Sequence, residues 1–293
     1  MMSTSEPQTI TYKKVGQLHL LLDLTLPPNS HKVPVLLWFH GGGLLQGRRD
    51  TNVPPHMVRG VTKYKYAFVS ADYRLAPQVG IQDIFEDVRD CIAFIRTELA
   101  KHTVPGVLDT HRLAVSGSSA GGYLALLAGL HVNPKPKVIL CIYPITDPLG
   151  NFFTTSQLHS LGAARTDPAL IAEFLDPQSE IVANSAPGDE SNRNKMYNYM
   201  LEKANLAALL RIGSGDEFRI ARTIFQCGLP PAYIVHPDGD KDVGVDQSDE
   251  VVGVMVGLNM EVGYKRLHGQ PHFFDLDEQV HLQDMYEFLL KHL

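Results

Sequence analysis

Uninterrupted apolar runs recur along the chain. A strand that is buried on both faces, as in a parallel sheet, gives such a run, whereas a half-exposed strand alternates between apolar and polar positions. The runs lie at residues 33–39, 66–71, 113–116, 138–143 and 232–235, with a weaker one at 262–267. Two further short strands are predicted near the N-terminus, at residues 10–15 and 18–23, joined by Gly16 and Gln17.

Segments with helical periodicity separate these runs. Within residues 83–99, Ile84, Val88, Ile92 and Ile95 recur at intervals of three or four, which places them on one face of a helix. Further helices are predicted at residues 120–130, 248–258 and 277–290. Strands that alternate with helices predict an α/β domain, in which helices flank a mostly parallel central sheet.

The alternating pattern breaks after residue 147. Asp-Pro pairs occur at residues 147–148, 167–168 and 176–177, a polar run follows at 187–195, and short helical pieces such as residues 196–210 are predicted. A piece of this size would bury little core of its own. We therefore interpret residues 147–210 as a helical lid inserted into a single domain that spans residues 1–293.

The composition restricts the classes of partner. The 293 residues are 44% hydrophobic and 20% charged, as in globular proteins, and the net charge of −6 argues against nucleic-acid binding, which usually needs a basic excess. No stretch approaches the roughly 20 apolar residues of a membrane-spanning helix, so no stable membrane anchor is expected. Cys91, Cys141 and Cys227 lack C-x-x-C spacing and fit reduced thiols. Since residues 1–14 show no signal-peptide core, a cytoplasmic location is expected.

Residues 117–121 match the pattern G-x-S-x-G, with Ser119 as its serine. They lie between a predicted strand and a predicted helix, which is the context that a nucleophilic serine on a sharp turn requires. The flanking Gly117 and Gly121 let neighbouring backbone pass closely in that turn, and the helix start offers amide donors where negative charge develops. The pattern predicts Ser119 as the nucleophile of an acyl-transfer reaction.

Residues 40–43, His-Gly-Gly-Gly, end the buried strand at 33–39. Consecutive glycines let a loop fold back and aim backbone N–H groups at an acyl oxygen. Alone, the motif would also fit a flexible turn after a strand. Its occurrence together with a well-placed G-x-S-x-G favours an oxyanion loop.

With these motifs in this order, and with Asp-Tyr-Arg-Leu-Ala-Pro at residues 72–77 between them, the chain resembles the hormone-sensitive-lipase-like branch of the α/β-hydrolase superfamily, particularly small fungal carboxylesterase-like members. The resemblance spans about residues 10–290 and is weakest in the lid. It implies oxyanion donors at the amides of Gly42, Gly43 and Ala120, with His40 orienting the glycine loop. It implies no cofactor, and analogy with relatives that dimerise allows a homodimer.

The acid of a serine triad follows the nucleophile in this fold and is expected in the loop after a late strand. The loop after residues 232–235 contains Asp238, Asp240 and Asp242. Asp240 matches the position in the resembling family best, Asp242 is the alternative acid, and Asp238 comes third. Carboxylates at this spacing also occur in calcium-binding EF-hands, but the sixth position is Val243 instead of glycine and the twelfth is Asp249 instead of glutamate, so no metal is expected.

The base is predicted in the loop after the last strand. His272 is followed by Phe-Phe-Asp, which fits the short histidine pattern of the resembling family, and His268 is the fallback. No H-E-x-x-H occurs, so zinc-dependent hydrolysis has no support. In the resulting scheme, Asp240 orients His272, and His272 accepts the proton of Ser119 as Ser119 attacks an ester carbonyl.

The predicted function is hydrolysis of carboxylic esters of small or short-acyl substrates through an acyl-enzyme. The alternatives are a biosynthetic hydrolase or lactonase of a secondary metabolite, and a non-catalytic small-molecule receptor on the same fold. The resembling gibberellin receptors lose the catalytic histidine, whereas His272 is present here. The segment after the nucleophile helix contains four residues that are expected either to line the acyl site or to pack between the lid and the rest of the domain. They are Tyr143, Asp147, Phe152 and Phe153.

Overall fold

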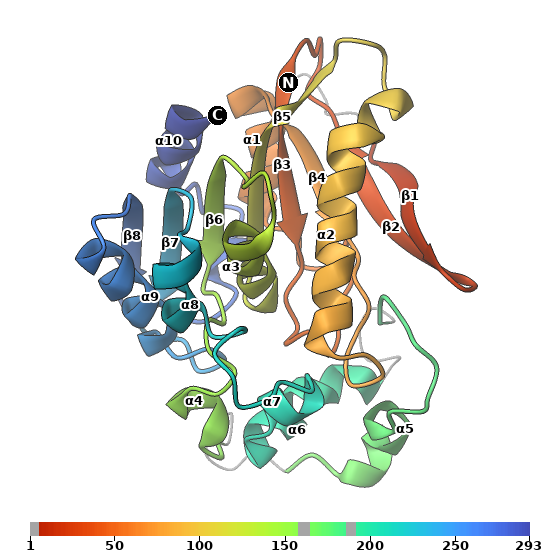
Figure 1. Ribbon diagram of the computed structural model, residues 1–293, viewed down its shortest axis with the longest axis vertical. Helices are drawn as coiled ribbons and strands as arrows, with labels where there is room; N and C mark the ends of the chain where they lie inside the picture. Colours follow the sequence, from red (N-terminus) through yellow and green to blue (C-terminus); the bar gives the residue numbers. More distant parts are fainter. Residues whose placement is uncertain (1–5, 158–164, 186–191) are drawn as a thin grey trace.

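The computed structural model describes residues 6–157, 165–185 and 192–293. Within them, eight strands form one sheet in the order β1-β2-β4-β3-β5-β6-β7-β8 (Figure 1). Strand β2 is antiparallel to both neighbours and every other adjacent pair is parallel, which confirms the mostly parallel sheet. The strands are β1 (Gln8–Val15), β2 (Leu18–Thr25), β3 (Val33–Phe39), β4 (Ala67–Ala71), β5 (Leu108–Ser118), β6 (Val138–Ile142), β7 (Ala232–Pro237) and β8 (Val262–Leu267).

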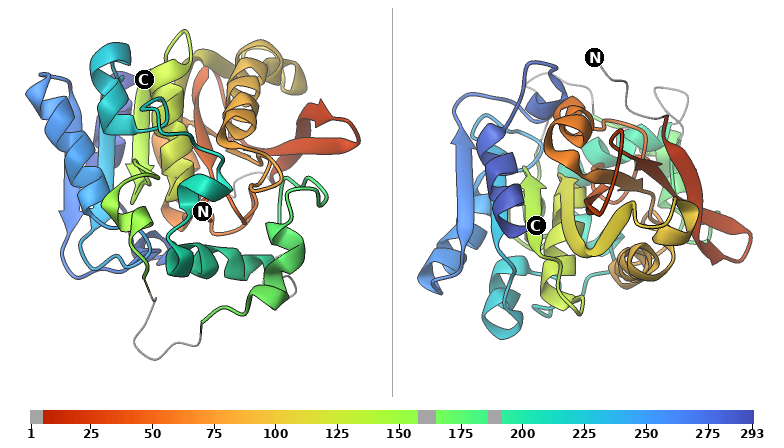
Figure 2. Two further views of the ribbon diagram at one scale, coloured as in Figure 1. Left: turned by 60° about the horizontal axis from the view of Figure 1, so that its bottom comes forward. Right: turned by 90° about the horizontal axis from the view of Figure 1, so that it is seen from above.

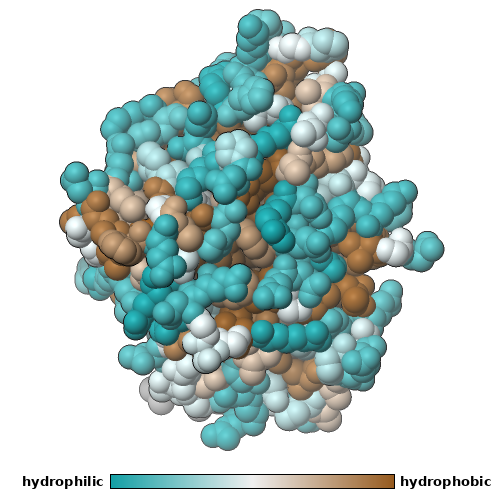
Figure 3. All heavy atoms as spheres, viewed as in Figure 1, coloured by the Kyte–Doolittle hydropathy of each residue, from teal (hydrophilic) through white to brown (hydrophobic). Residues whose placement is uncertain are grey.

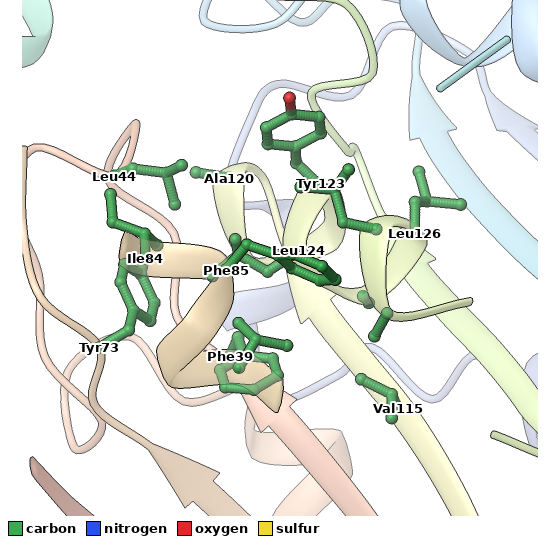
Figure 4. Packing of buried hydrophobic residues seen from close by; sticks show 14 of the residues in the cluster. Phe39, Leu44, Tyr73, Ile84, Phe85, Val115, Ala120, Tyr123, Leu124 and Leu126 are labelled. Atoms are coloured by element: carbon green, nitrogen blue, oxygen red, sulfur yellow. The ribbon is translucent and has the colours of Figure 1, made fainter. Parts of the chain in front are cut away.

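The central strand β3 explains why the apolar runs are continuous. All of its residues are buried, and they alternate between two hydrophobic clusters on opposite faces of the sheet, with Leu37 and Phe39 in one and Leu36 and Trp38 in the other. Figure 4 shows part of the first cluster, around Phe39. A side chain on either face of β3 is therefore removed from water, and only apolar residues do this at no cost in hydrogen bonds.

Helices cover both faces of the sheet (Figure 2). The first cluster includes residues from α2 (Ile81–Thr97), α3 (Ala120–His131), α8 (Ile220–Cys227) and α9 (Asp246–Gly257). The second includes residues from α1 (Pro55–Gly60), the π-helical turn η1 (Val61–Lys65) and α10 (Gln283–His292). The surface in Figure 3 is mostly hydrophilic, with apolar side chains gathered over α8 and α9, where Phe225 and Val256 are exposed. Among the described residues, no helix combines the length and the apolar character needed to cross a bilayer.

Short helical pieces fill the segment between β6 and α8 and lie beyond the carboxyl ends of the parallel strands (Figure 1). They are α4 (Asn151–Thr154), η3 (Pro168–Ile171), α5 (Ala172–Leu175), η5 (Asn192–Lys195), α6 (Met196–Lys203) and α7 (Leu206–Leu209). Arg193 ties this segment to the body, because its buried guanidinium donates to the carbonyl oxygens of Leu45 (2.8 Å) and Ala76 (2.9 Å) and to Oε1 of Gln78 (2.9 Å).

The helices differ from the predicted ones in three places. Residues 196–210 form two helices because Ala204 adopts the left-handed conformation, with φ at 52°. The last helix begins at Gln283 instead of residue 277, since Oδ1 of Asp277 accepts from the amide of Gln279 (2.8 Å) in a turn that precedes it. Helices α1 and α8 were not predicted; each has fewer than nine residues, too few for a clear helical period.

Candidate active site

Ser119 lies on a sharp turn between β5 and α3, as the sequence predicts. Its backbone is strained, with φ at 56° and ψ at −121°, and its amide donates to the carbonyl of Ile142 (2.9 Å). The two motif glycines are required by contact: a Cβ on Gly117 would lie 2.1 Å from the carbonyl carbon of Gly121, and one on Gly121 would lie 1.9 Å from the oxygen of Phe39. The turn is thus packed directly against the end of β3.

The glycine loop follows β3 and passes beside the nucleophile. A Cβ on Gly41 would lie 3.1 Å from Cβ of Ser119, and Gly42, with φ at 99°, makes a tight turn whose carbonyl accepts from the amide of Gln46 (3.2 Å). Gly43, with φ at 68°, lies under the ring of Tyr197. Positive φ values favour glycine, and a Cβ would lie 2.3 Å from the oxygen of Gln46 at Gly42 and 2.6 Å from Cδ2 of Tyr197 at Gly43. Ala120 follows Ser119 directly at the start of α3, and Gly42 lines a cavity together with Ser119, so these two predicted oxyanion residues lie beside the nucleophile.

The side chain of His40 supports the glycine loop. Its ring stacks on Tyr73, with 4.2 Å between ring centroids, and its Nδ1 lies 2.8 Å from the carbonyl oxygen of Gly41. Because that oxygen only accepts, Nδ1 carries the proton. The hydroxyl of Tyr73, which belongs to the motif at residues 72–77, donates to the carbonyl of His40 (2.8 Å). Burial lowers the pKa of His40 to about 4, so the ring is neutral near pH 7.

Asp240 and His272 come together from the loops after β7 and β8. Nδ1 of His272 lies 2.6 Å from Oδ2 of Asp240, while Oδ1 accepts from the amides of Asp242 (2.8 Å) and Val243 (2.9 Å). Burial alone would raise the pKa of the Asp240 carboxyl, but hydrogen bonds from His236 and His272 outweigh it and hold that pKa well below its usual range. Asp240 is therefore ionised and held in place at both oxygens.

The fallback residues occupy other positions. Asp238 and His268 pair with each other, with Oδ2 of Asp238 3.1 Å from Nδ1 of a His268 side chain that is 99% exposed. Asp242 lies closer, since potential ligand atoms of Asp240, Asp242 and His272 fall within 4.8 Å of one another. The hydrogen bond between Nδ1 of His272 and Asp240 leaves only Nε2 of His272 as a possible metal ligand. It is also the arrangement in which a carboxylate orients the base of a serine triad.

No sequence pattern marked His236, which lies next to Asp240, or Ser248, which contacts His236. His236 is fully buried at the end of β7, with Nε2 3.0 Å from the carbonyl oxygen of Val243 and 3.5 Å from Oδ2 of Asp240. Both oxygens are acceptors, so Nε2 of His236 carries the proton. Nδ1 of His236 therefore accepts a hydrogen bond from the hydroxyl of Ser248 on α9 (2.7 Å). A histidine inside an apolar strand carries no signal of this role, because Ser248 lies twelve residues further along.

A second buried carboxyl lies beneath His272. Asp275 accepts from the hydroxyl of Tyr143, and its Oδ2 lies 3.4 Å from Oγ of Ser118, next to the nucleophile. The ring of Tyr143 packs on His272, with 4.1 Å between centroids. Burial raises the pKa of Asp275 to about 6. The sequence pattern included Asp275 after His272 but gave it no role.

Two cavities meet at Ser119. The larger, of about 260 Å³, is lined by Trp38, His40, Gly41, Gly42, Gln46, Gly47, Thr51, Asn52, Ser118, Ser119, Tyr143, Ser185, Asn194 and Phe273. The smaller, of about 130 Å³, is lined by Gly42, Gln46, Ser119, Asn194, Tyr197, Asn198, Asp242, His272 and Phe273. The nucleophile and the base thus face the same space in the smaller cavity.

Of the four residues expected to wall the acyl site, only Tyr143 lines the larger cavity. Asp147 instead forms an ion pair with Arg219 (2.7 Å), and Phe153 is buried in the hydrophobic core. Phe152 packs against Phe153, with 4.9 Å between ring centroids. The sequence placed these residues near the site, and the structure assigns three of them to packing or ion pairing.

The sheet order, with a serine turn at the end of β5, gives the chain the α/β-hydrolase fold. Its fold matches that of an α/β-hydrolase superfamily protein from Enterococcus faecalis (TM-score 0.74, 19% identity, 98% of this chain and 97% of that one). It also matches an esterase of Pyrobaculum calidifontis (TM-score 0.67, 18% identity, 97% and 83%). The chain belongs to the BD-FAE family, whose model matches residues 22–255.

Among curated proteins, the chain is similar to the non-reducing polyketide synthase ausA of Aspergillus calidoustus. The two are 25% identical over 346 aligned residues, which cover 98% of this chain but only 14% of the synthase. The chain therefore spans a small part of the length of that relative.

Proposed function

We propose that this chain is a serine hydrolase that cleaves carboxylic esters of small or short-acyl substrates. Ser119 is the nucleophile, His272 the general base and acid, and Asp240 the residue that holds the tautomer of His272. The amides of Gly42, Gly43 and Ala120 bind the oxyanion. The observation that carries the proposal is the 2.6 Å contact between Nδ1 of His272 and Asp240, because it leaves Nε2 free to accept the proton of a serine in the same cavity.

The reaction proceeds in two balanced halves. Oγ of Ser119 bonds to the acyl carbon and gives its proton to His272, and the bond to the leaving oxygen breaks as His272 returns that proton to it. Water then attacks the acyl-enzyme with the same proton transfers and releases the acid. Within 147–210, the described residues 147–157, 165–185 and 192–210 lie beyond the carboxyl ends of the strands, and we propose that they act as a lid over this site.

A fluorophosphonate probe tests the proposal, since it reacts with an activated serine. The wild-type chain should be labelled at Ser119 and hydrolyse p-nitrophenyl butyrate, and S119A should lose both while keeping the wild-type circular dichroism spectrum. Substitution S118A at the neighbouring serine is the matched control and should keep the label. Tight binding of a small molecule by an unlabelled wild-type chain would instead favour the receptor alternative.

A second candidate is a hydrolase that cleaves an ester or lactone of a secondary metabolite. The observation in its favour is the similarity to a polyketide synthase along 98% of this chain. It uses the same residues, so labelling does not separate the two. Hydrolysis rates for a series of simple p-nitrophenyl esters against aromatic lactones would do so.

A further inference from the structure

Asp275 is a fully buried carboxyl group that the proposed mechanism does not use. Its Oδ1 accepts from the hydroxyl of Tyr143, whereas its Oδ2 lies 3.4 Å from Oγ of Ser118, which is long for a hydrogen bond between two oxygens. Within the part of the chain that the structure describes, no lysine or arginine lies within ion-pair distance of Asp275. A carboxylate is costly to bury in this way, and an asparagine would accept the same hydrogen bond without that cost.

Tyr143 is the residue through which Asp275 reaches the base. Its ring centroid lies 4.1 Å from that of His272, which is inside the roughly 6 Å over which an aromatic ring attracts a cation. The backbone of Tyr143 has φ at 39°, a strained value for a residue with a side chain, and its amide donates to the carbonyl of Val235 (2.7 Å). Because Asp275 accepts from the hydroxyl at the other end of the side chain, the ring is held at both ends.

This ring contact supplements the hydrogen bond from Asp240. Asp240 holds one edge of His272, at Nδ1. One hydrogen bond fixes a single point of the imidazole and leaves the ring free to tilt about that point. The ring of Tyr143 packs against His272 and restricts this tilt, so Nε2 stays directed into the cavity that contains Ser119.

The charge of His272 changes during the proposed reaction. His272 becomes positive each time it takes a proton from Ser119 or from water. A positive His272 favours the ionised form of Asp275, and by the same attraction an ionised Asp275 favours the positive form of His272. Since His272 is neutral in the resting enzyme, this attraction stabilises the transition state more than the ground state, which is the condition for raising kcat.

Resting on the proposed function, we infer that Tyr143 and Asp275 form a second support for His272, in which the ring of Tyr143 positions the imidazole and the negative charge of Asp275 stabilises its protonated form. Both are positioning residues, because they act through His272. Four titratable groups act on this pair: His272 after β8, Asp240 after β7, Tyr286 on α10 and the phenol of Tyr143 itself. Burial raises the pKa of both tyrosines, so neither carries a charge near pH 7.

Neutralising the carboxylate while keeping its shape tests the inference. D275N should lower kcat for p-nitrophenyl butyrate about threefold to tenfold, with KM changed less than about twofold. It should also move the acid limb of the kcat–pH profile by about 0.5 to 1 unit to lower pH, because His272 takes up its proton less readily without the nearby negative charge. A merely structural role would not move this limb.

Y143F removes the hydroxyl and keeps the ring. The carboxyl of Asp275 then loses its main hydrogen bond and stays neutral in its buried position, so the same two changes are expected. The two substitutions remove one interaction, and the double variant should therefore lose about as much as either single variant.

D147N is the matched control. Asp147 is also a buried carboxyl in the segment after β6, but it pairs with Arg219 (2.7 Å) instead of contacting Tyr143. D147N should lower the melting temperature, since it breaks this ion pair, while kcat and its acid limb stay as in wild type.

The inference is overturned if D275N changes only the melting temperature, if neither variant moves the acid limb, or if the two losses multiply in the double variant. Should D275N fail to fold, the profile of Y143F decides alone. Fluorophosphonate labelling is measured on the same preparations. A labelled and active wild type whose variants behave like D147N overturns this inference alone, whereas a wild type that is neither labelled nor active overturns the proposed function as well.

Discussion

Replacing Asp240 with asparagine has one geometric outcome in this site. Oδ1 of Asp240 faces two backbone amides, those of Asp242 and Val243, and these groups can only donate. The single oxygen of the asparagine must therefore occupy the Oδ1 position, which turns its NH2 group toward Nδ1 of His272. His272 then accepts at Nδ1 and carries its proton on Nε2, so it cannot accept the proton of Ser119.

The expected loss follows from this reversed tautomer. An equivalent substitution in a serine protease of unrelated fold lowers kcat about 10⁴-fold with the geometry intact, and we expect D240N to lower kcat/KM by a similar factor, or about 5.5 kcal/mol of transition-state stabilisation. The NH2 group would also face the Nε2 proton of His236, which lies 3.5 Å from Oδ2 in the native site. Two donors then face each other, which lowers the stability of the variant without giving Nδ1 of His272 an acceptor.

Initial rates with p-nitrophenyl butyrate at pH 7.5 measure this effect, with urea unfolding to show that the variant is folded. D242N is the matched comparison, because the side chain of Asp242 lines the smaller cavity whereas its amide, which holds Asp240, is unchanged. Its loss should stay below about tenfold. A loss below tenfold for D240N together with a large loss for D242N would refute the assignment and make Asp242 the acid.

Three further outcomes follow from the described contacts. H236F removes the N–H donor behind Asp240, so kcat should fall about tenfold with little change in KM; a lower melting temperature at unchanged kcat would mean a purely structural role. G121A should destabilise the fold by more than about 3 kcal/mol in urea unfolding, since its Cβ would lie 1.9 Å from the oxygen of Phe39, whereas G253A, with no atom within 4 Å, should be tolerated. The pKa of His40 is lowered from 6.5 to about 4, so the stability this neutral ring contributes is complete above pH 6.5 and is lost as pH falls toward 4, by about 3 kcal/mol; an unfolding free energy of wild type relative to H40Q that does not fall between pH 7 and 4.5 would contradict this.

The local sequence was sufficient to predict an element wherever the structure of a segment depends on its own residues. The apolar run at 33–39 predicted β3 because a central strand is buried on both faces. The glycines around Ser119 predicted the turn because their neighbours leave no room for a Cβ. The pairing of Asp240 with His272 was a prediction from position in the chain, and the 2.6 Å contact between them supports it.

The missing parts depend on residues far apart in the chain. Asp275 gains its role from Tyr143, which lies 132 residues earlier, and no local pattern marks a carboxyl that will be buried against it. The division of the site into two cavities likewise depends on α6, whose residues reach the nucleophile only after the segment between β6 and α8 has folded over the strands. A sequence pattern predicts which face of a helix or strand is buried, whereas these contacts depend on how the helices and strands pack against one another.

The direct backbone contact between Gly121 and Phe39 has a consequence for how this chain can change. The start of α3 and the end of β3 meet through main-chain atoms, with no side chain between Gly121 and Phe39. Other side chains that line the two cavities come from separate segments, including α6 and the loops after β6 and β8. Substrate range can therefore drift through substitutions in those segments, or be redirected by design, without retuning the distance on which the chemistry depends.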